Sequence, residues 1–127
     1  MDWDGNFSLM VDSEGQAGFR TIHADDILFF CVQQNQIIAH TLEEELFTGW
    51  YSLDRLWQAL KLSDPRFYRT DRVYIVNLSK IKKLDREWGK IYFTEDPGPT
   101  SKHCYVARLK LSEVQSRITS LAAEGLS

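Results

Sequence analysis

Cations gather around one short apolar segment of this chain, and they are the residues best placed to do chemistry. Arginines recur at every third position before Val73–Val76 and three lysines follow it: Arg66, Arg69, Arg72, Lys80, Lys82 and Lys83. Residues 66–90 carry eight basic side chains against three acidic ones, although the whole chain has a net charge of −3. Because a local field attracts a polyanion whatever the total charge, this stretch predicts a phosphate-facing surface, with an ordinary solvated face as the alternative.

Donors suited to nucleic acid also occur outside this stretch. Arg72 and Arg108 each end a short β-like segment, where a loop presents a side chain into a groove. The guanidinium fork matches phosphate and the O6/N7 edge of guanine. Gln34, Asn35 and Gln36 form a polar loop tip of amides, which pair with adenine, and the three lysines are suited to flanking phosphates. Each of these residues alone is more simply a solvated surface residue, but together they predict a contact surface.

Catalysis and metal binding find little support. The chain has no phosphate-cradling glycine-rich loop, no G-x-S-x-G elbow and no H-E-x-x-H motif. His23, His40 and His103 are far apart, and His103 and Cys104 are neighbours on a β-like segment, so their side chains point to opposite faces. Glu43–Glu45 is more simply a solvated turn than a catalytic carboxylate cluster. We expect no enzyme activity, no metal and no cofactor.

The compartment follows from three negative observations. No apolar run approaches the roughly 18 residues that span a bilayer, and the acidic start Met1–Asp4 differs from a signal peptide. Cys31 and Cys104 do not make a disulfide framework, and we expect two buried free thiols. These observations predict a cytoplasmic protein.

The elements that must position these residues are mostly strands. Short β-like stretches punctuated by Gly, Pro and polar turns predict about eight to ten strands. Residues 52–62 predict a central helix that Ser52 caps, and Pro65 ends it. A second helix is expected near the C-terminus, with a capping box at Ser112 and Gln115 and a stop at Gly125. The fold class is therefore mostly β with two helices.

Four stretches together resemble the LytTR DNA-binding domain of bacterial transcription regulators. They are "DDILFF", "SLDRLWQAL", "RFYRTDRVYIVNLSKIKKL" and "CYVARLKLSEV", and the similarity runs from about Phe19 to Ile118. The resemblance implies an elongated, mainly antiparallel β fold that contacts DNA through loops rather than a recognition helix. We divide the chain into a lead-in (1–18), the LytTR-like domain (19–121) and a tail (122–127). Whether the chain stands alone or belongs to a longer regulator stays open.

The resemblance also implies where DNA is contacted. The family's contact positions fall on the loop after the "DDILFF" strand, on Asp71 and Arg72, and on Arg108. The family often has a histidine where this chain has Asp71 and a small hydroxyl residue where it has Val73; Asp71 either accepts from cytosine or braces Arg69 or Arg72. The predicted DNA-contacting residues are Gln34, Asn35, Gln36, Arg69, Asp71, Arg72, Lys80, Lys82, Arg108 and Lys110.

Three functions are carried forward. The leading one is a sequence-specific regulator that binds double-stranded DNA, as a dimer on tandem sites and weakly associated or monomeric when free. The second is a β-rich protein–protein interaction module whose acidic half docks a basic partner. The third is a single-stranded nucleic-acid binder in which Trp50, Tyr68 or Trp88 stacks on bases.

Overall fold

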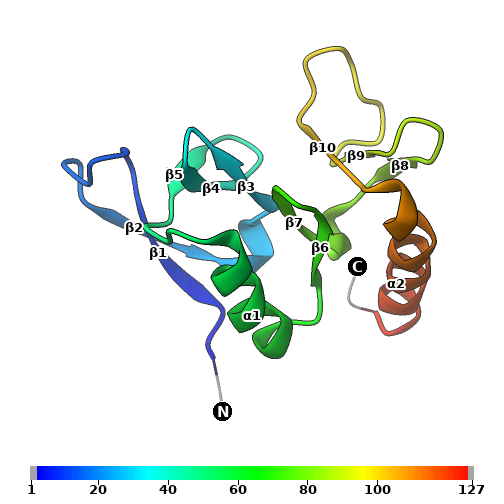
Figure 1. The fold of residues 1–127 in the computed structure, drawn as a ribbon, viewed down its shortest axis with the longest axis horizontal. Coiled ribbons are helices and arrows are strands. Elements are labelled where there is room, and N and C mark those ends of the chain that lie inside the picture. Colours follow the sequence, from blue (N-terminus) through cyan, green and yellow to red (C-terminus); the bar gives the residue numbers. More distant parts are fainter. Residues whose placement is uncertain (1–2, 126–127) are drawn as a thin grey trace.

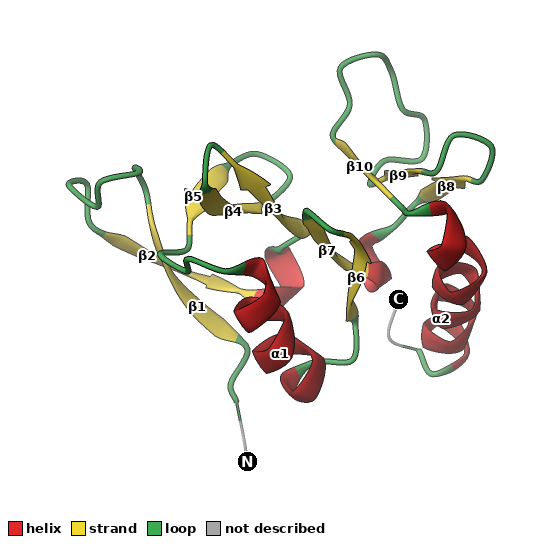
Figure 2. Ribbon diagram, viewed as in Figure 1, coloured by secondary structure: helices red, strands yellow, loops and turns green. Residues whose placement is uncertain are grey.

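Ten strands and two α-helices make up the chain in a computed structural model, which describes residues 3–125. Three short 3₁₀ turns, at Ala24–Asp26, Leu78–Lys80 and Arg108–Lys110, link some of these elements. The strands are β1 (Asn6–Met10), β2 (Phe19–His23), β3 (Phe29–Gln33), β4 (Gln36–His40), β5 (Glu45–Phe47), β6 (Phe67–Asp71), β7 (Tyr74–Asn77), β8 (Lys83–Asp85), β9 (Lys90–Tyr92) and β10 (His103–Tyr105). The helices are α1 (Leu53–Ser63) and α2 (Leu111–Ala123). The mostly β prediction is confirmed (Figure 2).

The strands form two antiparallel sheets. The large sheet has seven strands in the order β2-β1-β5-β4-β3-β7-β6, and the small sheet has the order β10-β9-β8. Many consecutive strands pair as hairpins, and β1 also pairs with β5. In addition β3 pairs with β7, which places Cys31 opposite Tyr74. This non-local pairing joins the two halves of the chain into one sheet, with β1 and β2 at one side and the small sheet at the other (Figure 1).

Each face of the large sheet packs a different hydrophobic core. Alternation along β3 sends Phe30 to the face that α1 covers, where it meets Leu56, Leu60, Phe67 and Ile75. The opposite face packs against the small sheet and α2 through residues that include Phe29, Val76, Ile91, Cys104 and Val114. The strands at the centre of the large sheet are thus buried on both sides, which holds their end loops in fixed positions.

The two helices begin in different ways. Ser52 caps α1 as expected, and its Oγ accepts a hydrogen bond from the backbone N–H of Arg55 at 3.3 Å. The capping box predicted at Ser112 and Gln115 is wrong, because α2 already begins at Leu111 without a side-chain cap. The 3₁₀ turn Arg108–Lys110 runs directly into α2, so the helix entry needs no capping side chain.

The ends of the chain differ in how much they contribute to the core. β1 pairs with β2 along its whole length and Leu9 is buried, so the predicted lead-in supplies a strand to the large sheet. The predicted tail overlaps the end of α2, and its last two residues, 126 and 127, lie outside the described part of the chain.

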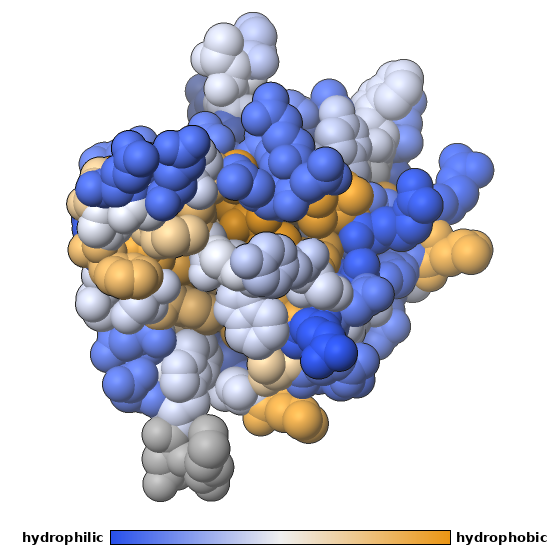
Figure 3. Space-filling view, turned by 60° about the vertical axis from the view of Figure 1, so that its left-hand side comes forward, coloured by the Kyte–Doolittle hydropathy of each residue, from blue (hydrophilic) through white to orange (hydrophobic). Residues whose placement is uncertain are grey.

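The surface is mainly polar. Large apolar side chains that are exposed, such as Phe19, Leu62 and Leu109, come from separate elements. In the space-filling view apolar surface appears as separate patches among polar side chains (Figure 3). None of the described helices is both long enough and apolar enough to cross a bilayer.

Candidate nucleic-acid interface

Two hairpin turns lie side by side at one end of the large sheet. Gln34 and Asn35 form the two-residue turn between β3 and β4, and both have positive φ, 52° and 63°. Such a turn matches the twist of a hairpin and places both side chains at its tip. Arg72 and Val73 connect β6 to β7, and the backbone N–H of Val32 donates to the Val73 carbonyl at 3.1 Å. This contact fixes the amide turn beside the arginine turn.

A third segment reaches the same end from the small sheet. The backbone N–H of Ala107 donates to the Thr70 carbonyl at 2.8 Å, and the Thr70 hydroxyl donates to the Tyr105 carbonyl at 2.9 Å. Thr70 is free to do this because the pairing of β6 with β7 shifts register between Arg69 and Asp71. A bulge of this kind redirects a strand at its end. Arg108 is therefore held next to the β6–β7 turn.

We call this region the loop end: Gln34, Asn35, Gln36, Asp71, Arg72, Val73 and Arg108. Arg108 does not close a strand as the sequence suggested, because β10 ends at Tyr105 and Arg108 starts the 3₁₀ turn before α2. Arg72 and Arg108 are exposed, and within residues 3–125 neither forms an ion pair. Both guanidinium groups are thus available to a ligand.

Arg69 and Lys110 support the loop end from behind. The Arg69 guanidinium pairs with Asp54 of α1 and donates to the Arg72 carbonyl at 2.7 Å. Lys110 donates to the Arg69 carbonyl at 3.0 Å. Arg69 pairs with Asp54 rather than with Asp71, which has no ion pair in the described residues, so Asp71 does not brace either arginine.

Two of the predicted contact residues lie elsewhere. Lys80 follows β7 at the opposite end of the strand and borders a groove of about 340 Å³ whose other charged residues are Arg20, Asp25, Asp26, Glu43 and Glu44. Lys82 is exposed beside the small sheet, where its backbone N–H donates to the Tyr92 carbonyl at 2.9 Å. Arg72 and Lys80 are close in sequence but lie at opposite ends of the large sheet, because β7 runs from one end to the other between them.

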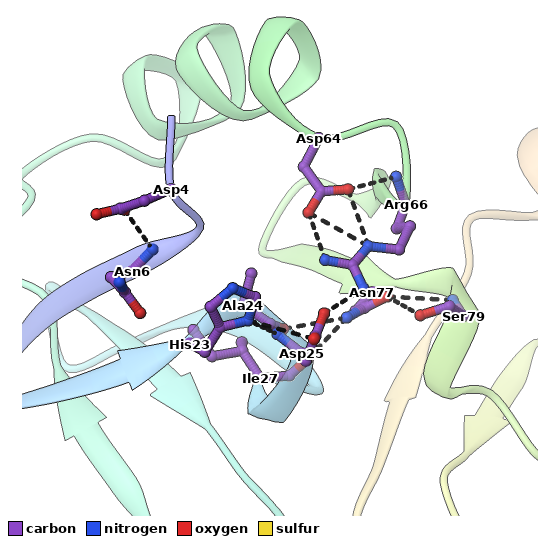
Figure 4. Close-up of polar contacts among 10 residues, drawn as sticks. All are labelled: Asp4, Asn6, His23, Ala24, Asp25, Ile27, Asp64, Arg66, Asn77 and Ser79. Carbon is purple, nitrogen blue, oxygen red and sulfur yellow. Dashed lines mark hydrogen bonds and ion pairs between the residues drawn. The ribbon is translucent and has the colours of Figure 1, made fainter. Parts of the chain in front are cut away.

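The opposite end of β6 and β7 is anchored by a group of polar contacts, in which Asn77 and Asp64 are buried (Figure 4). Asn77 is fully buried, and its amide donates to the carbonyls of Ala24 and Ile27 at 3.3 and 3.2 Å and accepts from Ser79. The Arg66 guanidinium contacts the carboxylates of Asp64 and Asp25, and the donation from Arg66 lowers the pKa of Asp25. We call this the anchor end: Asp25, Asp64, Arg66, Asn77 and Ser79.

The buried titratable cluster around His40 is unsuited to catalysis. The Lys102 ammonium lies 3.2 Å from His40 Nδ1, so that nitrogen accepts and Nε2–H faces Cys31 Sγ and Gln33 Oε1, each at 3.3 Å. Burial lowers the pKa of His40 to about 4 and raises the pKa of the Cys31 thiol to about 12. A neutral imidazole and an un-ionised thiol hold the strands together but do not make a nucleophile. Cys104 is also a buried free thiol.

Residues 3–125 contain no cluster of three or more His, Cys, Asp or Glu side chains that would hold a metal ion. Of the three aromatic residues that a single-strand binder would use, Tyr68 is only 8% exposed and is unavailable for stacking. Trp50 and Trp88 remain exposed, at 40% and 70%, but they lie on separate loops.

Sequence reasoning missed several polar and aromatic residues of the small sheet and its β8–β9 turn. Arg86 lies on the β8–β9 turn, and Lys90 and Tyr105 face the same side of the small sheet, where Lys90 Nζ lies 5.9 Å from the Tyr105 ring centre. The signal was present as the alternating polar and apolar residues of "KIY" and "HCY", which put charged and aromatic groups on one face. The stretches were interpreted only as strands.

Comparisons with known proteins agree on one family. The family model for the LytTr DNA-binding domain matches residues 17–119. A solved structure from Bacillus cereus, the LytTr DNA-binding domain of a protein described as a methyl-accepting/DNA response regulator, superposes with a TM-score of 0.68 at 15% identity. The match covers 91% of this chain and 98% of that one. No curated protein sequence matches. The chain therefore belongs to the LytTR DNA-binding domain family.

Proposed function

We propose that this protein is a bacterial, cytoplasmic transcription regulator that binds specific sequences in double-stranded DNA through the loop end. The observation that carries the proposal is the convergence of three chain segments at one end of the large sheet, each bringing exposed amide or guanidinium donors. Donors of these two types read adenine and guanine edges. Three loops held by a rigid sheet also meet the requirement that base-reading groups be fixed in position.

The contacts divide between base reading and positioning. Arg72, Arg108 and the amide turn at Gln34 and Asn35 are exposed at the loop end and are assigned to base edges. Asp71 is assigned to accept a hydrogen bond from a cytosine amino group, since no arginine in residues 3–125 pairs with its carboxylate. Lys82 is assigned to phosphate, because a flexible point charge outside the loop end supplies affinity without selecting a base. Arg69 and Lys110 act by supporting the β6–β7 turn.

The test compares Arg108→Ala with Lys82→Ala on a site selected from a random duplex pool and on random duplex DNA. Arg108→Ala should cost on the order of 1–3 kcal/mol on the selected site and little on random DNA. Lys82→Ala should weaken both roughly equally and reduce the salt slope by about one. Circular dichroism must first show both variants folded. Equal weakening of both DNAs by Arg108→Ala would make Arg108 a phosphate contact and move base reading to Arg72 and the amide turn.

We further propose that two copies bind tandem sites on one side of the duplex. The loop end is small and reads few base pairs, so two modules whose half-sites are spaced near a multiple of about 10.5 bp would both face the same side. Inserting about five base pairs between half-sites should abolish cooperative binding, as measured by gel shift. Unchanged affinity after that insertion would exclude cooperation through a fixed geometry.

A further inference from the structure

The outer face of the small sheet carries an ordered set of polar and aromatic side chains. In the register of this sheet Lys83, Tyr92 and His103 form one row of facing residues, and Asp85, Lys90 and Tyr105 form the next. Facing residues of antiparallel strands project to the same side, so these six share one face. Leu84, Ile91 and Cys104 alternate with them and pack in the core beneath. We call the six residues the small-sheet face.

Aromatic contacts connect the small-sheet face to the loop end. The ring centres of Tyr92 and His103 are 5.8 Å apart, and those of His103 and Tyr105 are 5.4 Å apart. Tyr105 in turn lies 6.3 Å from Tyr74, the first residue after the β6–β7 turn that carries Arg72. The two surfaces are therefore continuous, although they come from different sheets.

The β8–β9 hairpin is held rigidly beside this face. Gly89 has a φ of +62°, and a Cβ at this position would lie 2.9 Å from the Val106 carbonyl oxygen. The backbone N–H of Val106 donates to the Gly89 carbonyl at 2.8 Å. Asp85 Oδ1 accepts from the backbone N–H groups of Glu87 and Trp88, which orders the turn and leaves Arg86 and Trp88 exposed. The β8–β9 turn is thus fixed against Val106, which lies two residues before Arg108 in the sequence.

We propose that the small-sheet face is a second contact surface for duplex DNA, which binds backbone phosphates flanking the bases that the loop end reads. It deepens, and rests on, the proposed function. Lys83 and Lys90 outnumber the single carboxylate of Asp85, and tyrosine hydroxyl and imidazole N–H groups also donate to phosphate. Lysine is depleted in protein–protein interfaces, so Lys83 and Lys90 favour DNA over a protein partner on this face.

The experiment uses the full chain and two duplex probes. One probe holds only the selected site, and the other adds about one helical turn, roughly 10 bp, of random sequence on each side. Lys83→Gln, Lys90→Gln and their combination are compared with Lys61→Gln, which removes an exposed lysine from α1. Thermal melts establish that all four variants fold like the wild type.

The flanked probe should bind the wild type more tightly and with a steeper salt slope than the short probe. Each of Lys83→Gln and Lys90→Gln should lower that slope by about one on the flanked probe, and the combination by about two. Affinity for the short probe, and the preference for the selected site over a scrambled one, should be unchanged in these variants. Lys61→Gln should match the wild type on both probes.

Two outcomes would overturn the inference: no effect of flank length in the wild type, or lysine variants that behave like Lys61→Gln. In each case a retained preference for the selected duplex leaves the proposed function standing. Absence of any preference among duplexes would instead defeat the proposed function itself.

Discussion

Arg66 and Arg72 belong to the same sequence repeat but stand at opposite ends of β6 and have opposite roles. Arg66 is held by Asp64 and Asp25 at the anchor end, and its side chain is 19% exposed. Arg72 is exposed at the loop end, where the described residues offer it no carboxylate partner. Arg69, between them, pairs with Asp54 yet also holds the Arg72 carbonyl. A run of cations thus divides into structural and available members according to the acids that the fold places nearby.

The largest effect at the anchor end should come from Asn77→Ala. This change leaves the buried carbonyls of Ala24 and Ile27 without their donor, and we expect a loss of about 2–4 kcal/mol in the free energy of unfolding. Urea denaturation would show a lower midpoint with an unchanged m-value. Ser79→Ala, which removes only a partner of the Asn77 amide oxygen, should cost about 1 kcal/mol. Equal losses in the two variants would contradict the anchoring role of the amide nitrogen.

The contrast between the two arginines can be tested directly with Arg66→Met and Arg72→Met. Arg66→Met leaves the buried Asp64 carboxylate uncompensated and should cost about 2 kcal/mol of stability. Arg72→Met should change stability by less than about 0.5 kcal/mol, as at most exposed sites. Affinity for the selected duplex should fall in Arg72→Met and, once folding is corrected for, remain in Arg66→Met. Matching stability losses would remove the distinction between the two ends.

A smaller effect should appear as a pH dependence of stability that comes from His40. This residue lies opposite Phe29, at the end of β4 away from the loop end. Burial holds the pKa of His40 near 4 in the folded chain, below its usual 6.5, so the unfolded chain binds the extra proton. The contribution of neutral His40 to the free energy of unfolding is therefore complete above pH 6.5. It is lost as the pH falls from 6.5 towards 4. The nearby Lys102 ammonium also disfavours the charged imidazole, and we expect on the order of 1–2 kcal/mol between pH 7.5 and 5.

Urea denaturation of the wild type and His40→Gln at both pH values checks this expectation. The wild type should lose more stability than the variant on acidification, because glutamine does not titrate. A larger loss in the variant would mean that His40 gains rather than resists a proton in the folded chain.

Local patterns predicted local structure well. The apolar spacing and Ser52 predicted both ends of α1 to within one residue. The run of glutamines and asparagine predicted the β3–β4 turn. Both depend on contacts between near neighbours in sequence. The start of α2 was predicted two residues late and with the wrong cap, because the preceding 3₁₀ turn depends on the tertiary contact between Ala107 and Thr70.

The candidate site was less predictable, since it depends on which carboxylate meets which cation. Nothing in the sequence indicates that Asp54 of α1 engages Arg69, or that Lys80 joins Asp25 and Asp26 at the far end of β7. A run of charges in the sequence shows only which residue types are present. A strand then carries residues that are close in sequence to opposite ends of the sheet. The ends of two β-like segments and the family resemblance together pointed to Arg72 and Arg108, whereas charge counting alone gave no way to choose among the cations.

The β3–β7 pairing also bears on how the chain folds. Hairpins such as β3–β4 and β6–β7 join neighbouring segments and can form early. Cys31 meets Tyr74 only after β4, β5, α1 and β6 have been enclosed in a loop. The contact between Val32 and Val73 that sets the two turns side by side belongs to this late step. A partly folded chain with intact hairpins would therefore lack the assembled surface, so a ligand of the loop end should stabilise the completed fold and none of its fragments.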